Sequence, residues 1–337
     1  MFAEAAEACA VVAAQLAANQ QGVRAIGASL RARPPHTVVT FARGSSDHAA
    51  TFAKYLFETR AGVLTASGAP SIASIYGAPA HLDGVLALAI SQSGRSPDLL
   101  SAMAAAKGAG AETLALVNAD GSPLGELAGT LLPLCAGPER SVAATKSFIA
   151  TLSALVHLVA VWREDGELAD ALAAAPALLA RAWEADWTPL VDGLAQARGL
   201  YVIGRGLGLG IAEEAALKMK ETCGLHAEAF SAAEVRHGPM ALIGPDLPLL
   251  ILRQSDETGP GIDDLAAEMA ARGGPVFLAG ASGPIPGVIL LPGPVAHPAI
   301  EPMLRVQSFY RAVNALSVTR AHNPDAPPHL SKVTETL

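Results

Sequence analysis

Residues 85–97 read VLALAISQSGRSP. The first six are apolar and do not alternate with polar residues, which is typical of a strand buried on both faces of a parallel sheet. The next six are polar or glycine, and Pro97 is a residue that favours the first position of a helix. This stretch therefore predicts a strand, a tight loop and a helix, which is the building unit of an α/β fold.

Further apolar runs of similar length are spread along the chain. They occupy residues 37–42, 114–117, 130–134, 200–203, 247–252, 276–279 and 288–291. Ala- and Leu-rich stretches separate them, and the helix-rich segments 1–30, 141–187 and 299–319 cover or link them. The alternation predicts parallel α/β sheets with helices as crossover connections.

The strand ends repeat at a constant distance. Arg43-Gly44 and Gln92-Ser93 recur 162 positions later as Arg205-Gly206 and Gln254-Ser255. The apolar run 114–117 meets the run 276–279 at the same shift. One offset that aligns three strand ends without gaps predicts two copies of one α/β domain.

Composition excludes several classes of protein. The 337 residues suffice for about two domains, and 51% hydrophobic against 16% charged residues provides a large core. The net charge of -8 argues against a nucleic-acid-binding protein, because such proteins usually carry an excess of basic residues. Three cysteines without metal-type spacing argue against a disulfide framework or a zinc site.

The sequence also argues against membrane association. The N-terminus carries Glu4 and Glu7 and no basic region, so it predicts an amphipathic helix and not a signal peptide. The most hydrophobic stretch, residues 148–162, is too short to span a bilayer and contains Thr151, Ser153 and His157. We therefore expect a soluble cytoplasmic protein.

Two loops of the first copy are rich in hydroxyls. Ser91, Ser93 and Ser96 precede a helix, whose N-terminus favours negative charge, and Ser45 and Ser46 follow the neighbouring strand. The alternative is that these residues only turn the chain and cap helices. In the second copy the equivalent loop carries Asp256 and Glu257, which would repel an anion. We therefore expect phosphate binding in the first copy alone.

The segment GRGLGLG at 204–210 links a strand to a helix, as a dinucleotide-binding loop does. Its spacing does not fit that motif, because Leu209 or Ile211 stands where the third glycine should be. A tight turn with a close helix explains the glycines, and no nicotinamide cofactor is expected.

Candidate acid–base residues follow this segment. Glu214, Lys218 and Glu221 lie at i, i+4 and i+7 of a predicted helix and so share one face. The pattern is consistent with a solvated stripe of ion pairs, or with a base whose neighbouring cation stabilises developing negative charge. His237 precedes Gly238-Pro239 on a predicted turn, where an imidazole could exchange protons near neutral pH.

Several segments together resemble the sugar isomerase (SIS) family, in particular the isomerase module of glutamine-dependent glucosamine-6-phosphate synthase and the stand-alone glucosamine-6-phosphate deaminases. The segments are 42–46, 91–96, 141–146, 214–221, 234–239 and 330–332. They are collinear and extend from about residue 24 to residue 337.

The resemblance implies two tandem SIS domains, each a flavodoxin-like three-layer α/β/α sandwich with a parallel sheet. We place an N-terminal helix at 1–23, the phosphate-binding domain at 24–165, the domain with the catalytic helix at 190–320 and an active-site tail at 321–337. The resemblance also implies a homodimer with shared active sites.

The resemblance assigns a role to each candidate residue. Ser46, Ser91, Gln92, Ser93 and Ser96 would bind the sugar phosphate, beneath a loop that contains Val142, Ala144 and Thr145. Glu221 would shuttle a proton between C1 and C2 with Lys218 and Glu214 beside it, and His237 would assist ring opening, donated across the dimer interface. Lys332 would engage the open-chain sugar, although composition alone predicts a solvated tail lysine.

Departures from the family affect the expected reaction. The synthases carry a glutaminase domain with an N-terminal catalytic Cys, whereas Phe2 follows Met1 here, so we expect no glutamine hydrolysis. Arg43 replaces a small residue and Arg95 an acidic one. We expect an enzyme without metal or cofactor that converts glucosamine-6-phosphate to fructose-6-phosphate and ammonia. The alternatives are another phosphosugar isomerase, a deglycase of a phosphorylated sugar-amine adduct, or a non-catalytic sugar-phosphate sensor.

Overall fold

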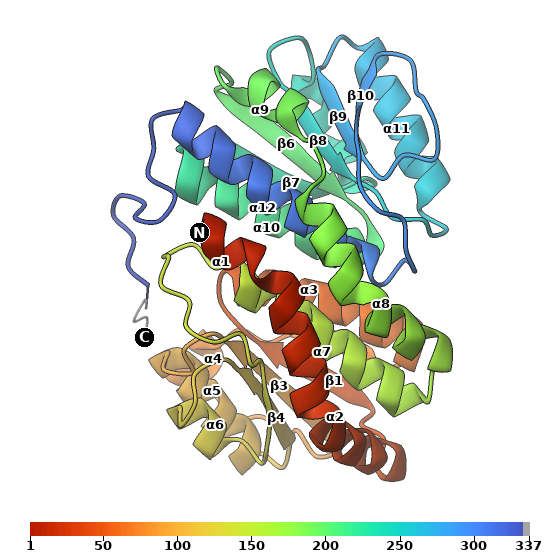
Figure 1. The fold of residues 1–337 in the computed structure, drawn as a ribbon. Coiled ribbons are helices and arrows are strands. Elements are labelled where there is room, and N and C mark those ends of the chain that lie inside the picture. Colours follow the sequence, from red (N-terminus) through yellow and green to blue (C-terminus); the bar gives the residue numbers. More distant parts are fainter. Residues whose placement is uncertain (333–337) are drawn as a thin grey trace. The chain divides into compact units, whose positions relative to one another are not determined.

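The computed structural model describes residues 1–332, which form two compact units (Figure 1). The N-terminal unit comprises Ala10–Glu139, Lys146–Ala173 and the tail from Ser331. The C-terminal unit comprises Met1–Cys9, Arg140–Thr145 and Ala174–Leu330. Helices α2 (Ala8–Ala32) and α8 (Gly166–Trp183) belong partly to each unit. The domain boundaries given above stay a prediction.

The N-terminal unit is built on a five-stranded parallel sheet with the order β2-β1-β3-β4-β5. Its strands are β1 (Thr37–Phe41), β2 (Leu64–Ser67), β3 (Val85–Ser91), β4 (Glu112–Val117) and β5 (Thr130–Pro133). The strand β3 is buried along its whole length, as its uninterrupted apolar run predicted. The chain winds outward in opposite directions from β1, so the carboxyl ends of β1 and β3 flank the point where ligands bind in such sheets.

Helices cover both faces of this sheet. On one face α5 (Pro97–Gly108) buries Leu99 and Met103 against Ala87 and Ala89 of β3, with α4 (Ser71–Ser74) and α6 (Pro123–Leu127) beside it. Helix α3 (Ser45–Leu56) packs on β1, β2 and β3 and against α7 (Lys146–Arg163). The π-helix η1 (Phe57–Ala61) continues α3. The unit thus has the α/β layers that the sequence predicted.

The C-terminal unit repeats the same topology. Its parallel sheet has the order β10-β9-β8-β6-β7, in which β6, β7 and β8 take the places of β1, β2 and β3. The strands are β6 (Gly199–Gly204), β7 (His226–Ser231), β8 (Leu249–Leu252), β9 (Val276–Ala279) and β10 (Val288–Leu291). The first residues of β1 and β6, Thr37 and Gly199, are 162 positions apart, so the structure confirms the duplication.

Helices also cover both faces of the second sheet. Helix α11 (Gly259–Ala271) packs on one face with the short 3-10 helices η3 (Glu234–His237) and η4 (Pro239–Leu242). Helix α10 (Leu209–Cys223) contacts β6, β7 and β8, and α12 (Glu301–Thr319) packs on α10. The 3-10 turn η2 (Gly206–Gly208) leads into α10, and α9 (Thr188–Leu194) and α1 (Phe2–Ala6) contact α12.

Among residues 1–332, one helix meets the length and hydropathy expected of a membrane span. Helix α7 has 18 residues, but 83% of them are buried inside the protein, which is typical of a core helix. The expectation that residues 148–162 are too short to span a bilayer needs correction, because these residues belong to the longer helix α7, whose length alone would allow a span. Cytoplasmic location stays a prediction.

Candidate active site

The two hydroxyl-bearing loops lie side by side in the N-terminal unit. Strands β1 and β3 are paired in parallel, with Phe41 opposite Ala89, so the loops after them meet at one edge of the sheet. Ser45 and Ser46 begin α3, and Ser91–Ser96 lead into α5. The structure thus brings together the residues that were predicted to bind phosphate.

The loop after β3 is ordered by its own hydroxyls. Ser91 Oγ accepts a 3.0 Å hydrogen bond from the Gly94 amide, and Ser93 Oγ accepts a 3.4 Å bond from the Arg95 amide. Each hydroxyl keeps its own hydrogen to donate to an anion. Ser96 occupies the N-cap of α5 but makes no side-chain cap, which argues against a purely structural role for it.

Gly94 is required at its position. Its φ of +63° is unfavourable for other residues, and a Cβ there would come within 2.6 Å of Ser122 Oγ. The glycine therefore allows the loop to turn tightly in front of the helix N-terminus.

An ion pair ties the two loops together. Arg43 on the β1–α3 loop contacts Oδ2 of Asp98 through Nε at 2.9 Å and Nη2 at 2.8 Å. Asp98 lies in the first turn of α5 and is fully buried, whereas half of the Arg43 side chain is exposed. Asp98 was not singled out in the sequence, because a carboxylate in the first turn of a helix is ordinary.

The second copy uses the same loop to bind its own side chain. Ser255, equivalent to Ser93, donates to the carboxylate of Glu301 through its amide at 2.6 Å and its hydroxyl at 2.9 Å. Glu301 is fully buried and lies 3.6 Å from Arg305. The amide and hydroxyl of Ser255, which could otherwise bind an external anion, are therefore already hydrogen-bonded within the protein.

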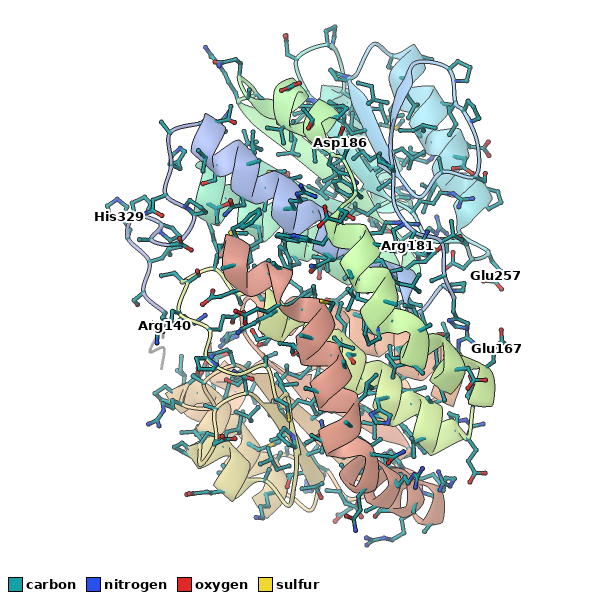
Figure 2. All side chains as sticks on the ribbon, viewed as in Figure 1. Arg140, Glu167, Arg181, Asp186, Glu257 and His329 are labelled. Atoms are coloured by element: carbon teal, nitrogen blue, oxygen red, sulfur yellow. The ribbon has the colours of Figure 1, made fainter. Side chains whose placement is uncertain are left out.

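The acidic residues of this second loop play a smaller part than the sequence suggested. Asp256 accepts a 2.9 Å bond from the Thr258 amide, and the Glu257 side chain projects outward from the edge of the ribbon in Figure 2. Glu301, and not Asp256 or Glu257, accepts the hydrogen bonds from the amide and hydroxyl of Ser255.

The glycine-rich turn between β6 and α10 also has a packing explanation. A Cβ on Gly204 would collide with the carbonyl oxygen of Gly208, and one on Gly208 would lie 2.5 Å from Oε1 of Gln254. The Gln254 amide in turn donates to the Arg205 carbonyl. Close packing therefore explains these glycines, as expected of a tight turn with a close helix.

The predicted base cluster is present on α10. Lys218 Nζ lies 3.2 Å from Oε1 of Glu214 and 2.7 Å from Oε2 of Glu221. The side chains of Glu214 and Lys218 are fully buried, and 20% of the Glu221 side chain is exposed. The stripe is thus not a solvated row of ion pairs.

Burial and charge act in opposite directions on the central lysine. Burial alone would lower the pKa of Lys218, but the carboxylates of Glu214 and Glu221 raise it above its ordinary value. Lys218 is therefore an ammonium held between two carboxylates. Glu221, the partly exposed end, is the carboxylate that a substrate could reach.

Tyr310 joins this cluster from α12. Its hydroxyl donates a 3.0 Å hydrogen bond to Oε1 of Glu214. The residue was missed because 96 positions separate it from Glu214 and it lies within an apolar helical pattern.

The remaining predicted residues are distributed over both units. His237 ends η3 and is exposed, and in residues 1–332 no hydrogen bond or ion pair links it to Glu221. Val142, Ala144 and Thr145 belong to a short segment of the C-terminal unit, where the Val142 amide donates to the Asp325 carbonyl at 3.4 Å.

Lys332 belongs to the N-terminal unit and has a specific partner. Its Nζ lies 3.2 Å from Oε2 of Glu139, a buried carboxylate that also accepts a 2.6 Å hydrogen bond from the Ser147 hydroxyl. The tail lysine is therefore not simply solvated. Glu139 was missed because only folding brings it to a residue 193 positions away.

Within the described residues, no group of three or more His, Cys, Asp or Glu side chains is arranged to hold a metal ion. The three cysteines, Cys9, Cys135 and Cys223, are all unpaired thiols.

Comparisons with known proteins agree with this architecture. The sequence profile of the SIS domain matches residues 33–161 and 193–279. The chain is 34% identical over 330 residues to the isomerizing glutamine–fructose-6-phosphate aminotransferase of Thermus thermophilus. That alignment covers 93% of this chain and 54% of the relative, so the chain spans about half the length of the relatives of this kind.

Solved structures match over nearly the whole chain. A Silicibacter pomeroyi protein that carries the provisional name phosphosugar isomerase has a TM-score of 0.92 and 39% identity, covering 96% of this chain and 99% of that one. The C-terminal domain of the glucosamine-fructose-6-phosphate aminotransferase from Francisella tularensis has a TM-score of 0.86. Its identity is 24%, with 96% of this chain and 97% of that domain covered, which shows the fold alone. With two repeats of one parallel α/β sheet, each matched by the same domain profile, this chain belongs to the SIS domain family.

Proposed function

We propose that this protein is a phosphosugar aldose–ketose isomerase that releases the amine of glucosamine-6-phosphate, giving fructose-6-phosphate and ammonia. The observation that carries the proposal is the cluster of Glu214, Lys218 and Glu221, in which a partly exposed carboxylate is held by a buried ammonium. Proton transfer at carbon needs such a base, together with a cation that stabilises the developing negative charge.

The hydroxyl loops support a phosphorylated substrate. Ser46, Ser91, Gln92, Ser93 and Ser96 line one edge of the sheet beside the first turns of α3 and α5. Helix N-termini and hydroxyl donors favour a phosphate group. The names of the Thermus thermophilus and Silicibacter pomeroyi relatives refer to phosphorylated sugars as well.

The proposed reaction moves a carbon-bound proton from C2 to C1 and then hydrolyses an imine. The C1 carbonyl of the open-chain sugar acidifies the C2 proton, which Glu221 removes and delivers to C1. The C1 oxygen gains a proton and the C2 nitrogen gives one up, leaving a hydroxyl on C1 and an imine at C2. One water then adds to C2 and one ammonia leaves. Lys218 stabilises the negative charge that develops when C2 loses its proton, and Lys332 engages the open-chain sugar.

A panel of substrates tests this function. We expect purified protein to release ammonia and fructose-6-phosphate in equal amounts from glucosamine-6-phosphate. Glu221→Gln should lower kcat about 1000-fold, within the range for removal of a general base. Glu228→Gln changes an exposed carboxylate on β7 of the same unit and should not alter kcat. Wild-type protein without turnover on any hexose phosphate would overturn the proposal.

The panel also separates the alternative activities. Arg43, paired with Asp98, adds a guanidinium to the hydroxyl-bearing loops. This additional cation favours a second candidate, an isomerase or deglycase for a different phosphorylated sugar or sugar-amine adduct. Turnover of such a substrate without ammonia release would favour this reading. A non-catalytic sensor would bind the phosphosugar and leave it unchanged, although the base cluster would then have no role.

We further propose a homodimer in which His237 serves the active site of the partner subunit. The exposed position of His237, away from the contacts of its own Glu221, supports a role outside its own chain. Mixing inactive Glu221→Gln with inactive His237→Ala should form heterodimers with one complete site and restore part of the activity. An inactive mixture, with subunit exchange verified, would show that His237 does not act in this way.

A further inference from the structure

Tyr310 reaches the base cluster from a separate helix of the C-terminal unit. Helix α12 packs along α10, and the Tyr310 hydroxyl meets Oε1 of Glu214 at 3.0 Å. Both residues are fully buried. The contact therefore lies at the buried end of the cluster, opposite the partly exposed Glu221.

The contacts of the cluster run in series. Tyr310 donates to Glu214, Glu214 lies 3.2 Å from Lys218, and Lys218 lies 2.7 Å from Glu221. The same oxygen of Glu214, Oε1, accepts from both the phenol and the ammonium. This shared oxygen links the phenol to the lysine, so a change at the phenol can reach the ammonium through it.

The presence of a tyrosine rather than a phenylalanine at position 310 requires a physical explanation. The Tyr310 ring is buried beside Phe309, with ring centroids 6.2 Å apart, and a phenylalanine would fill almost the same volume. A buried hydroxyl is costly unless it is hydrogen-bonded. Its bond to a buried carboxylate is of the charge-assisted kind, which is stronger than a bond between neutral groups.

We propose that Tyr310 is a positioning residue for proton transfer, holding the Glu214 carboxylate so that the Lys218 ammonium stays on Glu221. The inference rests on the proposed function. Without the phenol, Oε1 of Glu214 loses a hydrogen-bond donor and draws the ammonium more strongly to itself. Glu221 then loses part of the contact that orients it and that stabilises negative charge on the substrate.

The variant Tyr310→Phe tests the inference. We expect kcat to fall about 10-fold, a change that the loss of one hydrogen bond to a charged group can produce. KM should stay within about twofold, because phosphate affinity comes from the loops of the N-terminal unit. The matched control is Tyr201→Phe, which removes the hydroxyl of another buried tyrosine, in β6 beside Phe230, and should leave kcat unchanged.

A double-mutant cycle separates positioning from a general packing effect. If Tyr310 acts through Glu214, then Tyr310→Phe should cause no further loss of kcat in a Glu214→Gln background. Additive losses would overturn the inference. Should Tyr310→Phe not fold, Glu214→Gln with Tyr310 in place must lower kcat at least about 10-fold at unchanged KM. Unchanged kcat in Glu214→Gln would overturn the inference, because Tyr310 is proposed to act through Glu214.

The outcomes distinguish this inference from the proposed function. A wild-type protein that turns over no phosphosugar overturns both. Active wild-type protein together with a Tyr310→Phe variant of unchanged kcat overturns the role of Tyr310 and leaves the proposed reaction intact.

Discussion

Arg43 and Asp98 form an ion pair that joins the two hydroxyl-bearing loops of the N-terminal unit, with 2.8 Å between Nη2 and Oδ2. The two residues are 55 positions apart, and only the pairing of β1 with β3 brings their loops together. The carboxylate is fully buried, and this guanidinium and the first turn of α5 both stabilise it.

Arg43→Met should therefore destabilise the protein by leaving a buried carboxylate without its cation. We expect a loss of about 2 kcal/mol in the free energy of unfolding, measured in urea. The double variant Arg43→Met/Asp98→Asn should recover most of that loss, but its KM for the phosphosugar should stay raised because the loops are no longer joined. Arg33→Met breaks an exposed pair with Glu112 in the same unit and should cost less than about 0.5 kcal/mol. Equal losses in both single variants would contradict the assigned role of Asp98.

Glu301 predicts one phosphosugar site per chain. Because its carboxylate already binds the amide and hydroxyl of Ser255, titration calorimetry should give one equivalent bound per wild-type chain. Glu301→Ala should destabilise the protein by about 3 kcal/mol, since Arg305 and the Ser255 amide lose a buried partner. Sulfate should restore part of the stability in this variant and not in the wild type. Two equivalent sites in the wild type would show that the second loop is open to ligands.

The amine of Lys332 should affect kcat, and its positive charge should affect stability, and the two effects should be separable. Lys332→Arg keeps a cation for the buried carboxylate of Glu139, so the free energy of unfolding should change by less than about 0.5 kcal/mol. If the amine engages the open-chain sugar, kcat should nevertheless fall about 100-fold. Lys332→Ala should lose both activity and about 1 kcal/mol of stability. Full activity in the arginine variant would mean that only the positive charge is needed.

The thiol of Cys223 should make the protein less stable in alkaline solution. Burial raises its pKa to about 11 from an ordinary value of 9.0. Between these two values the unfolded chain loses the thiol proton and the folded protein keeps it, so stability falls as pH rises. From pH 8 to pH 10 the loss due to Cys223 should be about 1 kcal/mol. Urea unfolding at both pH values should show a smaller decline for Cys223→Ala than for the wild type; an identical decline would contradict the assignment.

Most strands and both copies of the sheet could be predicted from the sequence. Central strands such as β3 and β9 are buried on both faces, so each appears as an uninterrupted apolar run. The strands β2 and β7 were missed because they lie at sheet edges and are partly exposed, and β7 contains His226 and Glu228. Their first residues, Leu64 and His226, also lie 162 positions apart, so the repeat itself could have located them.

The candidate site was predictable where its residues follow one another along the chain. Glu214, Lys218 and Glu221 share a helix face whatever the rest of the fold does, and the serine loops follow directly from a strand. Their burial was not predictable, since a helical stripe of alternating charges is usually solvated. The stripe is buried because α12 covers α10 and removes Glu214 and Lys218 from water.

The sequence by itself therefore determined the duplicated α/β fold, the hydroxyl loops and the order of the acid–base residues, because all three depend on local periodicity and spacing. Only the tertiary structure decided which residues from separate elements become partners of the buried charged groups. Asp98 meets Arg43, Glu139 meets Lys332, Glu301 meets Ser255 and Tyr310 meets Glu214, each pair from separate elements. The physical reason is that a buried charge requires a partner within hydrogen-bonding distance, and chain folding sets that distance where sequence separation does not.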